Sequence, residues 1–145
     1  MESGSELVEV RLREIQASDG PGLQIMILGE VGGERLFPIF IGPSEMEALD
    51  RALHGKETLR PLTHDLVLNV VEGLGGELNR VLIDDLHDDT FYGKLLIKTT
   101  GGEEALIDSR PSDAIVLAAR RRVPIYVAEH ILDTIGKSPP EDEFG

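Results

Sequence analysis

One nine-residue stretch, Ile107–Ile115 (IDSRPSDAI), constrains how this chain can fold more than any other part of the sequence. An apolar strand is expected to end at Asp108. A helix is expected to begin near Pro111, because proline suits a first helical position, where its missing N–H would be unpaired anyway. Residues 114–119 are apolar on every side, so this helix is expected to be buried. A buried helix holds the strand-to-helix corner rigidly, and we expect any functional site of the protein at this corner.

Two carboxylates flank the corner, and each has more than one chemical use. Asp108 and Asp113 could be a pair of oxygen ligands for Mg²⁺ or Mn²⁺, or an acid and base pair. Alternatively, Asp113 caps the helix, where a carboxylate meets the positive end of the helix dipole, and Asp108 pairs with Arg110. Arg110 itself could clamp a phosphate through two parallel hydrogen bonds, or form a structural ion pair. The sequence leaves these alternatives open.

A second polar pair is expected at the start of another helix. Thr63 can cap this helix, which places His64 and Asp65 in its first turn. The positive end of the helix dipole disfavours an imidazolium, so a neutral His64 could act as a general base. Alternatively, both side chains only face water. Four further acids crowd one predicted hairpin end and would suit either a divalent cation or a solvated turn: Asp84, Asp85, Asp88 and Asp89.

Hydrophobic periodicity predicts an α+β fold with a mixed or antiparallel sheet. Strands and helices are expected in the order βββαα, then βββα, then βα, which differs from the regular alternation of a doubly wound sheet. Short turns join the first three strands, so a meander is expected. The predicted strands cover residues 7–15, 23–28, 35–41, 78–85, 90–99, 103–108 and 124–127. The predicted helices begin near residues 43–44, 63, 111 and 129.

Three local patterns refine this expectation. Pro38 lacks the N–H that a sheet ladder needs, so the third strand is expected at a sheet edge or with this nitrogen turned outward. The first helix begins either at Ser44, which has capping-box spacing with Glu47, or after a Gly42 cap. In the second helix one apolar stripe is expected to be buried, and it comprises Leu66, Val67, Val70, Val71 and Leu74.

The 145 residues are expected to form one domain, residues 7–135, with a flexible N-terminus (1–6) and a disordered acidic tail (136–145). The chain has no cysteine, which excludes a disulfide framework and thiolate chemistry. No apolar run approaches the roughly 20 residues of a membrane span, so no membrane partner is expected. The acidic N-terminus lacks the basic and apolar regions of a signal peptide, so a cytoplasmic location is expected.

The formal net charge is −13, from 27 acidic and 14 basic residues. Nucleic-acid-binding proteins normally present a basic face, so the composition argues against tight binding of DNA or RNA. The one basic run, Arg120–Arg122, lies at the predicted end of the buried helix, where cations complement the helix dipole. Tyr92, Leu96 and Tyr126 lie on predicted strands, where apolar surface beyond the core of one monomer could be left over. A homo-oligomer, most simply a two-fold dimer, is therefore expected.

Five segments, in their order and spacing, resemble the bifunctional nuclease family: Phe37–Glu45, Arg60–Asp65, Thr90–Gly93, Asp108–Ile115 and Pro124–Glu129. The likeness covers roughly residues 7–135. It implies an α+β fold, a homo-oligomer and, because the family takes its name from plant members described as degrading both DNA and RNA, a nuclease activity. The candidate site residues come from their chemistry in this sequence and not from the resemblance: Asp108, Arg110, Asp113, His64 and Asp65.

Two functions fit these observations. The first is a phosphodiesterase acting on DNA and RNA without sequence preference. In it, Asp108 and Asp113 hold a divalent cation that polarises the phosphate and activates water, Arg110 stabilises developing charge, and His64 transfers protons. The second is a non-enzymatic homo-oligomeric or ligand-binding module, in which the polar corner maintains the fold or a subunit contact. An open cleft at the corner favours the first function, and mutual burial of its charges favours the second.

Overall fold

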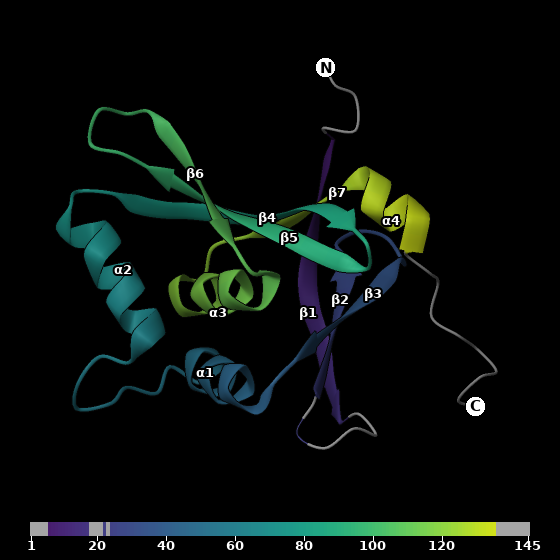
Figure 1. Cartoon of the computed structure of the whole chain (residues 1–145), viewed down its shortest axis with the longest axis horizontal. Helices are drawn as coiled ribbons and strands as arrows, with labels where there is room; N and C mark the ends of the chain where they lie inside the picture. Colours follow the sequence, from purple (N-terminus) through teal and green to yellow (C-terminus); the bar gives the residue numbers. More distant parts are fainter. Residues whose placement is uncertain (1–5, 18–21, 23, 136–145) are drawn as a thin grey trace.

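The computed structural model describes residues 6–17, 22 and 24–135, which form a seven-stranded sheet and four helices (Figure 1). The predicted α+β fold of a single domain is confirmed. The expected tail and the expected flexible N-terminus, apart from residue 6, lie outside the described residues. Among the residues that are described, no helix has both the length and the apolar composition needed to cross a membrane. The elements are β1 (Leu7–Ala17), β2 (Gln24–Glu30), β3 (Leu36–Ile41), α1 (Pro43–Leu53), α2 (Thr63–Gly73), β4 (Glu77–His87), β5 (Thr90–Lys98), β6 (Glu104–Ser109), α3 (Pro111–Arg121), β7 (Ile125–Ala128) and α4 (Glu129–Ile135).

The sheet has the strand order β3-β2-β1-β7-β4-β5-β6. Neighbouring strands are antiparallel except β4 and β7, which are parallel. The predicted meander of β1, β2 and β3 is confirmed, and so is the edge position of Pro38, because β3 is an outermost strand. The last strand in sequence, β7, lies at the centre and joins the meander to β4, β5 and β6. Figure 1 shows these two halves running crosswise, with α1 and α3 beside the place where they meet.

Helix α3 forms the centre of the core, as its apolar sequence predicts. Residues 114–118 are all buried. Ile115 and Val116 belong to a cluster that includes the meander, α1 and α4. Ala114 and Leu117 belong to a second cluster, which includes β4, β5 and α2. Because α3 packs into both clusters, its first turn is held firmly in place.

The starts of the first two helices differ in how well the sequence predicts them. Helix α1 begins at Pro43 with Gly42 as N-cap, which is the second of the two alternatives. Helix α2 begins at Thr63 with Leu62 as N-cap, so the prediction of Thr63 as the capping residue is wrong by one position. Asp65 explains the shift, because its Oδ2 accepts the backbone N–H of Leu62 at 3.0 Å and stabilises the earlier start.

The prediction of one buried stripe on α2 is wrong at three of its five positions. Leu66, Val70 and Leu74 are 55%, 50% and 79% exposed, whereas the fully buried residue of the helix is Leu68. Figure 1 shows α2 at the side of the molecule, next to α3. Only one face of α2 therefore meets the core. Since apolar residues surround most of this helix, periodicity alone could not identify the face that packs.

Candidate functional site

The strand-to-helix corner is built as the sequence predicts. Strand β6 ends at Ser109, Arg110 is the N-cap with extended backbone (φ −69°, ψ 146°), and Pro111 is the first residue of α3. Gly93 of β5 lies directly against this corner. A Cβ at Gly93 would lie 3.0 Å from the carbonyl oxygen of Ser109 and 3.3 Å from the nitrogen of Pro111. A side chain at this position would therefore displace the corner and the polar residues that it carries.

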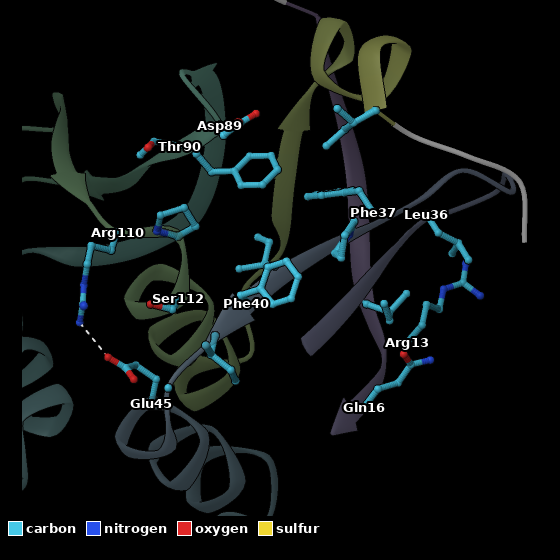
Figure 2. Close-up of a pocket in the computed structure, with 18 of the residues that line it drawn as sticks. Arg13, Gln16, Leu36, Phe37, Phe40, Glu45, Asp89, Thr90, Arg110 and Ser112 are labelled. Carbon is cyan, nitrogen blue, oxygen red and sulfur yellow. Dashed lines mark hydrogen bonds and ion pairs between the residues drawn. The ribbon is translucent and has the colours of Figure 1, made fainter. Parts of the chain in front are cut away.

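The carboxylate of Asp113 is the centre of a group of four polar side chains. Its Oδ1 lies 2.9 Å from Nε2 of His64, and its Oδ2 accepts a 2.8 Å hydrogen bond from Nε of Arg110. Nη2 of Arg110 donates to Oδ1 of Asp113 at 3.3 Å and to Oε2 of Glu45 at 3.2 Å. We call Glu45, His64, Arg110 and Asp113 the polar cluster. Figure 2 shows the contact between Arg110 and Glu45 at one wall of a cavity.

The polar cluster brings together the first turns of three helices. Glu45 lies in the first turn of α1, His64 in that of α2 and Asp113 in that of α3. Because these side chains are linked by direct contacts, the first turns of the three helices lie near one another. Each end carries a partial positive charge and backbone N–H groups without helical partners, which favour a bound anion. The site is therefore suited to carboxylates and phosphates despite the acidic composition of the chain.

The ionisation of the cluster follows from these contacts. Burial opposes the charged form of Asp113, but hydrogen bonds from Arg110 and His64 outweigh burial and hold the pKa of this carboxyl below its ordinary value of 3.8. The hydrogen bond to Asp113 also raises the pKa of Arg110. A neutral His64 that donates its Nε2–H to the carboxylate keeps a lone pair on Nδ1. At neutral pH the cluster thus combines an anionic orienting group, a cation and a potential base.

Asp65 belongs to the start of α2 and not to the polar cluster. Besides accepting the N–H of Leu62, its carboxylate lies 3.4 Å from Nε of Arg120. The next arginine, Arg121, donates two hydrogen bonds of 2.7 and 3.0 Å to Glu72. The basic run at the end of α3 therefore ties α3 to both ends of α2, in addition to its position at the negative end of the helix dipole.

Asp108 also lies outside the polar cluster. Its neighbour Ile107 pairs with Leu95 of the core, and successive residues of a strand point to opposite faces of the sheet, so Asp108 faces away from α3. Its side chain is 82% exposed and lies 4.0 Å from Nζ of Lys94, which faces it across β5 and β6. Asp108 and Asp113 therefore have different partners on different faces.

The described residues include no group of three or more His, Cys, Asp or Glu side chains arranged to hold a metal ion. At the β4–β5 hairpin, Asp84 pairs with Lys94, and Asp85 accepts the backbone N–H of Leu86. In the polar cluster, both carboxylate oxygens of Asp113 have hydrogen-bond donors. The carboxylate oxygens of the described residues are not arranged as a metal site. Binding of Mg²⁺ or Mn²⁺ by Asp108 and Asp113 stays a prediction.

A cavity of about 1090 Å³ opens beside the polar cluster (Figure 2). Arg110 and Glu45 line one side of it, and Arg13 of β1 lies on the opposite side. Between them, Phe40 of edge strand β3 is 61% exposed. Ser112, whose side chain is buried, lies at the base of the wall formed by α3. Aromatic and apolar walls with a few polar groups are typical of substrate and ligand sites.

Two residues of this site were not identified from the sequence. The sequence indicates only a helix start at Glu45, because its partner Arg110 is 65 positions away, beyond any local pattern. The sequence indicates only a strand at Phe40, although this residue is an aromatic two positions after Pro38 on an edge strand. Both lie within Phe37–Glu45, one of the segments that carry the family resemblance, and this shared segment was the available signal.

Comparison with known proteins agrees with that resemblance. A sequence model of the bifunctional nuclease domain matches residues 26–140. An uncharacterized protein of Mycobacterium tuberculosis H37Rv is 37% identical over 134 residues, which cover 92% of this chain and 79% of that protein. Bifunctional nuclease 1 of Oryza sativa subsp. japonica is 32% identical over 124 residues, which cover 84% of this chain and 36% of the rice protein. Bifunctional nuclease 2 of Arabidopsis thaliana is 27% identical over 113 residues, which cover 77% of this chain and 34% of that protein.

Proposed function

This chain belongs to the bifunctional nuclease family, and from that membership we propose that it hydrolyses phosphodiester bonds of DNA and RNA without sequence preference. The polar cluster is the proposed active site. The observation that carries this assignment is the contact of Asp113 with both His64 and Arg110, of which Arg110 lines an open cavity. A base and a cation held by one carboxylate are the groups that phosphodiester hydrolysis needs.

His64 is the proposed general base. Its Nδ1 accepts a proton from the water whose oxygen attacks phosphorus, and the imidazolium then releases this proton to solvent. The leaving oxygen departs on the opposite side of phosphorus and takes its proton from water. Asp113 is a positioning residue in this step, because its Oδ1 holds the ring through Nε2 and stabilises the imidazolium when it forms. The geometry requires the phosphate to lie on the Nδ1 side of the ring.

Arg110 is the proposed group that binds the phosphate and stabilises its developing charge. Its side chain is 66% exposed, so part of the guanidinium is open to solvent although Asp113 and Glu45 bind other parts of it. Charge-assisted hydrogen bonds from a held guanidinium strengthen as negative charge grows on the non-bridging oxygens. The N-terminal ends of α1, α2 and α3 add partial positive charge near the polar cluster.

The cavity is the proposed path of the substrate strand. Phe40 offers an exposed ring on which a base can stack, and stacking is tolerant of sequence because every base has a π-face. This favours single-stranded DNA and RNA. The net charge of −13 repels the substrate at low ionic strength, so binding is expected to be weak and to depend on screening.

Assistance by Mg²⁺ or Mn²⁺ is the part of the proposal that rests on the sequence alone. A divalent ion would supply Lewis acidity and would offset the negative field of the chain. Because the carboxylates of Asp108 and Asp113 contact different partners on different faces of the sheet, we assign no step to the ion. Removal of metal tests this point directly.

One observation favours the non-enzymatic alternative. The charges of Arg110 and Asp113 are paired with each other, as they would be in a cluster that only stabilises the fold. The exposure of Arg110 and the open cavity favour the enzyme. The enzymatic function predicts that loss of His64 abolishes cleavage. The non-enzymatic alternative predicts that loss of His64 leaves any observed cleavage unchanged.

The test is a cleavage assay with purified protein on labelled single-stranded DNA and RNA. His64→Ala is compared with His87→Ala, an exposed histidine outside the cluster, prepared in the same way. The proposal expects loss of activity by at least about 100-fold in the first variant and wild-type activity in the second. Equal cleavage by both variants would indicate a contaminating nuclease and the non-enzymatic alternative. EDTA, and separately Asp108→Asn, decide whether a metal ion contributes.

A further inference from the structure

Ser112 is a buried polar side chain without a partner. It is 9% exposed, and no hydrogen bond joins its hydroxyl to any other part of the described chain. Ser109 at the same corner differs, because its hydroxyl donates to the carbonyl oxygen of Arg110 at 2.8 Å. Burial of an unpaired hydroxyl is unfavourable, and folded proteins contain few such groups. The hydroxyl of Ser112 is therefore available to a ligand.

Ser112 faces the cavity beside the polar cluster. It lines this cavity together with Arg110, and Figure 2 shows it between Arg110 and Phe40. The guanidinium of Arg110 is itself partly open to solvent. A ligand that Arg110 binds in the cavity would lie near the hydroxyl of Ser112, and an anion would accept hydrogen bonds from both groups. The unpaired hydroxyl thus points to a ligand that accepts hydrogen bonds.

Backbone N–H groups add further donors at the start of α3. Arg110, the N-cap residue, accepts the N–H of Ala114 at 3.0 Å and provides no side-chain cap. Pro111 has no N–H. The N–H groups of Ser112 and Asp113 consequently have no acceptor among the described residues. Both lie in the first turn of an 11-residue helix, where the helix dipole favours a bound anion.

We propose that Ser112 and the first turn of α3 bind one non-bridging oxygen of a phosphodiester, while Arg110 binds its other non-bridging oxygen. This inference rests on the proposed function for the nature of the ligand, and it adds a substrate-binding residue that the polar cluster does not include. Because α3 is buried, its donors are already in place. They orient the phosphate without the cost of ordering a flexible side chain.

The charge of the cavity indicates which class of phosphate it binds. Two arginines and three acids line it: Arg13, Arg110, Glu14, Glu45 and Asp89. The donors of Ser112 are neutral, so they do not offset a second negative charge on the ligand. A phosphodiester carries one negative charge, whereas a terminal phosphate carries about −1.5 to −2 at pH 7. The cavity therefore favours a diester within a strand over a phosphate at the end of a strand.

The binding test compares two serines of the same corner. Fluorescence anisotropy with labelled single-stranded DNA in EDTA measures binding without cleavage. Ser112→Ala is expected to weaken binding by about 10-fold or more, because a charged acceptor loses a hydrogen bond. Ser109→Ala removes a hydroxyl that is bound within the chain and does not line the cavity, so its binding should equal that of the wild type. Wild-type affinity of Ser112→Ala overturns the proposal.

Stability separates a hydroxyl that binds a ligand from one that supports the fold. Ser112→Ala removes no hydrogen bond within the described chain. The midpoint of its urea unfolding should therefore equal or exceed that of the wild type, because an unpaired buried hydroxyl is lost. A lower midpoint would show that the hydroxyl stabilises the fold, and it would overturn the proposal.

Amide resonances of the isotope-labelled wild type test the ligand class without any substitution. Thymidylyl-thymidine carries one diester and no terminal phosphate, whereas thymidine 5′-monophosphate carries one monoester. In EDTA the diester should shift the amide signals of Ser112 and Asp113 at a concentration about 5-fold lower than the monoester, because the monoester bears the extra charge. Equal or tighter binding of the monoester, or no shift of these two signals with either ligand, overturns the proposal.

Neither binding measurement depends on cleavage. If Ser112 contributes to DNA binding in EDTA but the wild type cleaves nothing, the proposed function fails and this inference stands. If the wild type cleaves DNA and Ser112→Ala retains its kcat and KM, this inference fails and the proposed function stands.

Discussion

Nε2 of His64 lies 2.9 Å from Oδ1 of Asp113, although 49 positions separate the two residues in the chain. This contact joins the first turn of α2 to the first turn of α3. It also gives the proposed base, His64, a carboxylate that orients its ring. The proposed active site depends on this pair more than on either residue alone.

Asp113→Ala should lower the free energy of unfolding by about 0.5–2 kcal/mol, because Arg110 and His64 both lose a charged acceptor. Urea unfolding at pH 7 measures the change. Asp108→Ala is the control, since Asp108 is exposed and should alter the stability by less than about 0.5 kcal/mol. Equal stability of Asp113→Ala and the wild type would show that the cluster does not stabilise the fold.

Acid should remove the contribution of Asp113 to stability. The folded-state pKa of this carboxyl lies below 3.8, so its ionised form stabilises the fold at higher pH. That contribution is lost as the pH falls through the folded-state pKa. Thermal unfolding of the wild type and of Asp113→Asn should therefore differ at pH 7, and the difference should shrink as the pH falls below 3.8 and through the folded-state pKa. A difference that persists unchanged in acid would contradict the assigned ion pairs.

Phe40→Ala should weaken the binding of single-stranded DNA by about 5- to 100-fold, because a base loses its stacking partner. Fluorescence anisotropy with a labelled oligonucleotide in EDTA measures binding without cleavage. Tyr92→Ala is the matched control, because Tyr92 is an exposed aromatic residue that does not line the cavity. If both variants bind like the wild type, the substrate does not lie along the cavity.

Gly93→Ala should disturb the corner that carries Arg110. The added methyl group would lie 3.0 Å from the carbonyl oxygen of Ser109, and relief of this contact should cost about 1–3 kcal/mol of stability. Activity should fall with it, because Arg110 moves with the corner. Gly101→Ala, where a Cβ meets no atom within 4 Å, is the control for stability and activity. Wild-type behaviour of Gly93→Ala would mean that the corner tolerates displacement.

The sequence by itself determined the elements and the corner. Turn residues and apolar alternation placed the meander and the edge position of Pro38, and the apolar run after Pro111 placed the buried helix α3. These features depend on residues within a few positions of one another. Proline acts locally through its fixed φ angle and its missing N–H, and the side-chain periods of strand and helix are also local. Both can therefore be read from one sequence.

Only the tertiary structure decided which polar residues meet. The sequence grouped Asp108 with Asp113 because they are five positions apart, but strand alternation turns Asp108 away from α3. Glu45 and His64, which are distant in sequence, are brought to the corner because the starts of α1 and α2 adjoin that of α3. Proximity along the chain does not determine the direction of a side chain, and the packing of elements does.

The two faces of α2 give the same lesson for apolar residues. Periodicity showed that Leu66 and Val70 share one side of the helix, yet whether that side is buried depends on the elements beside it. Helix α2 lies at the side of the molecule and packs through Leu68, so Leu66, Val70 and Leu74 remain exposed. The hydrophobic effect favours burial against any apolar neighbour. Only the arrangement of the whole chain decides which side of α2 has such a neighbour.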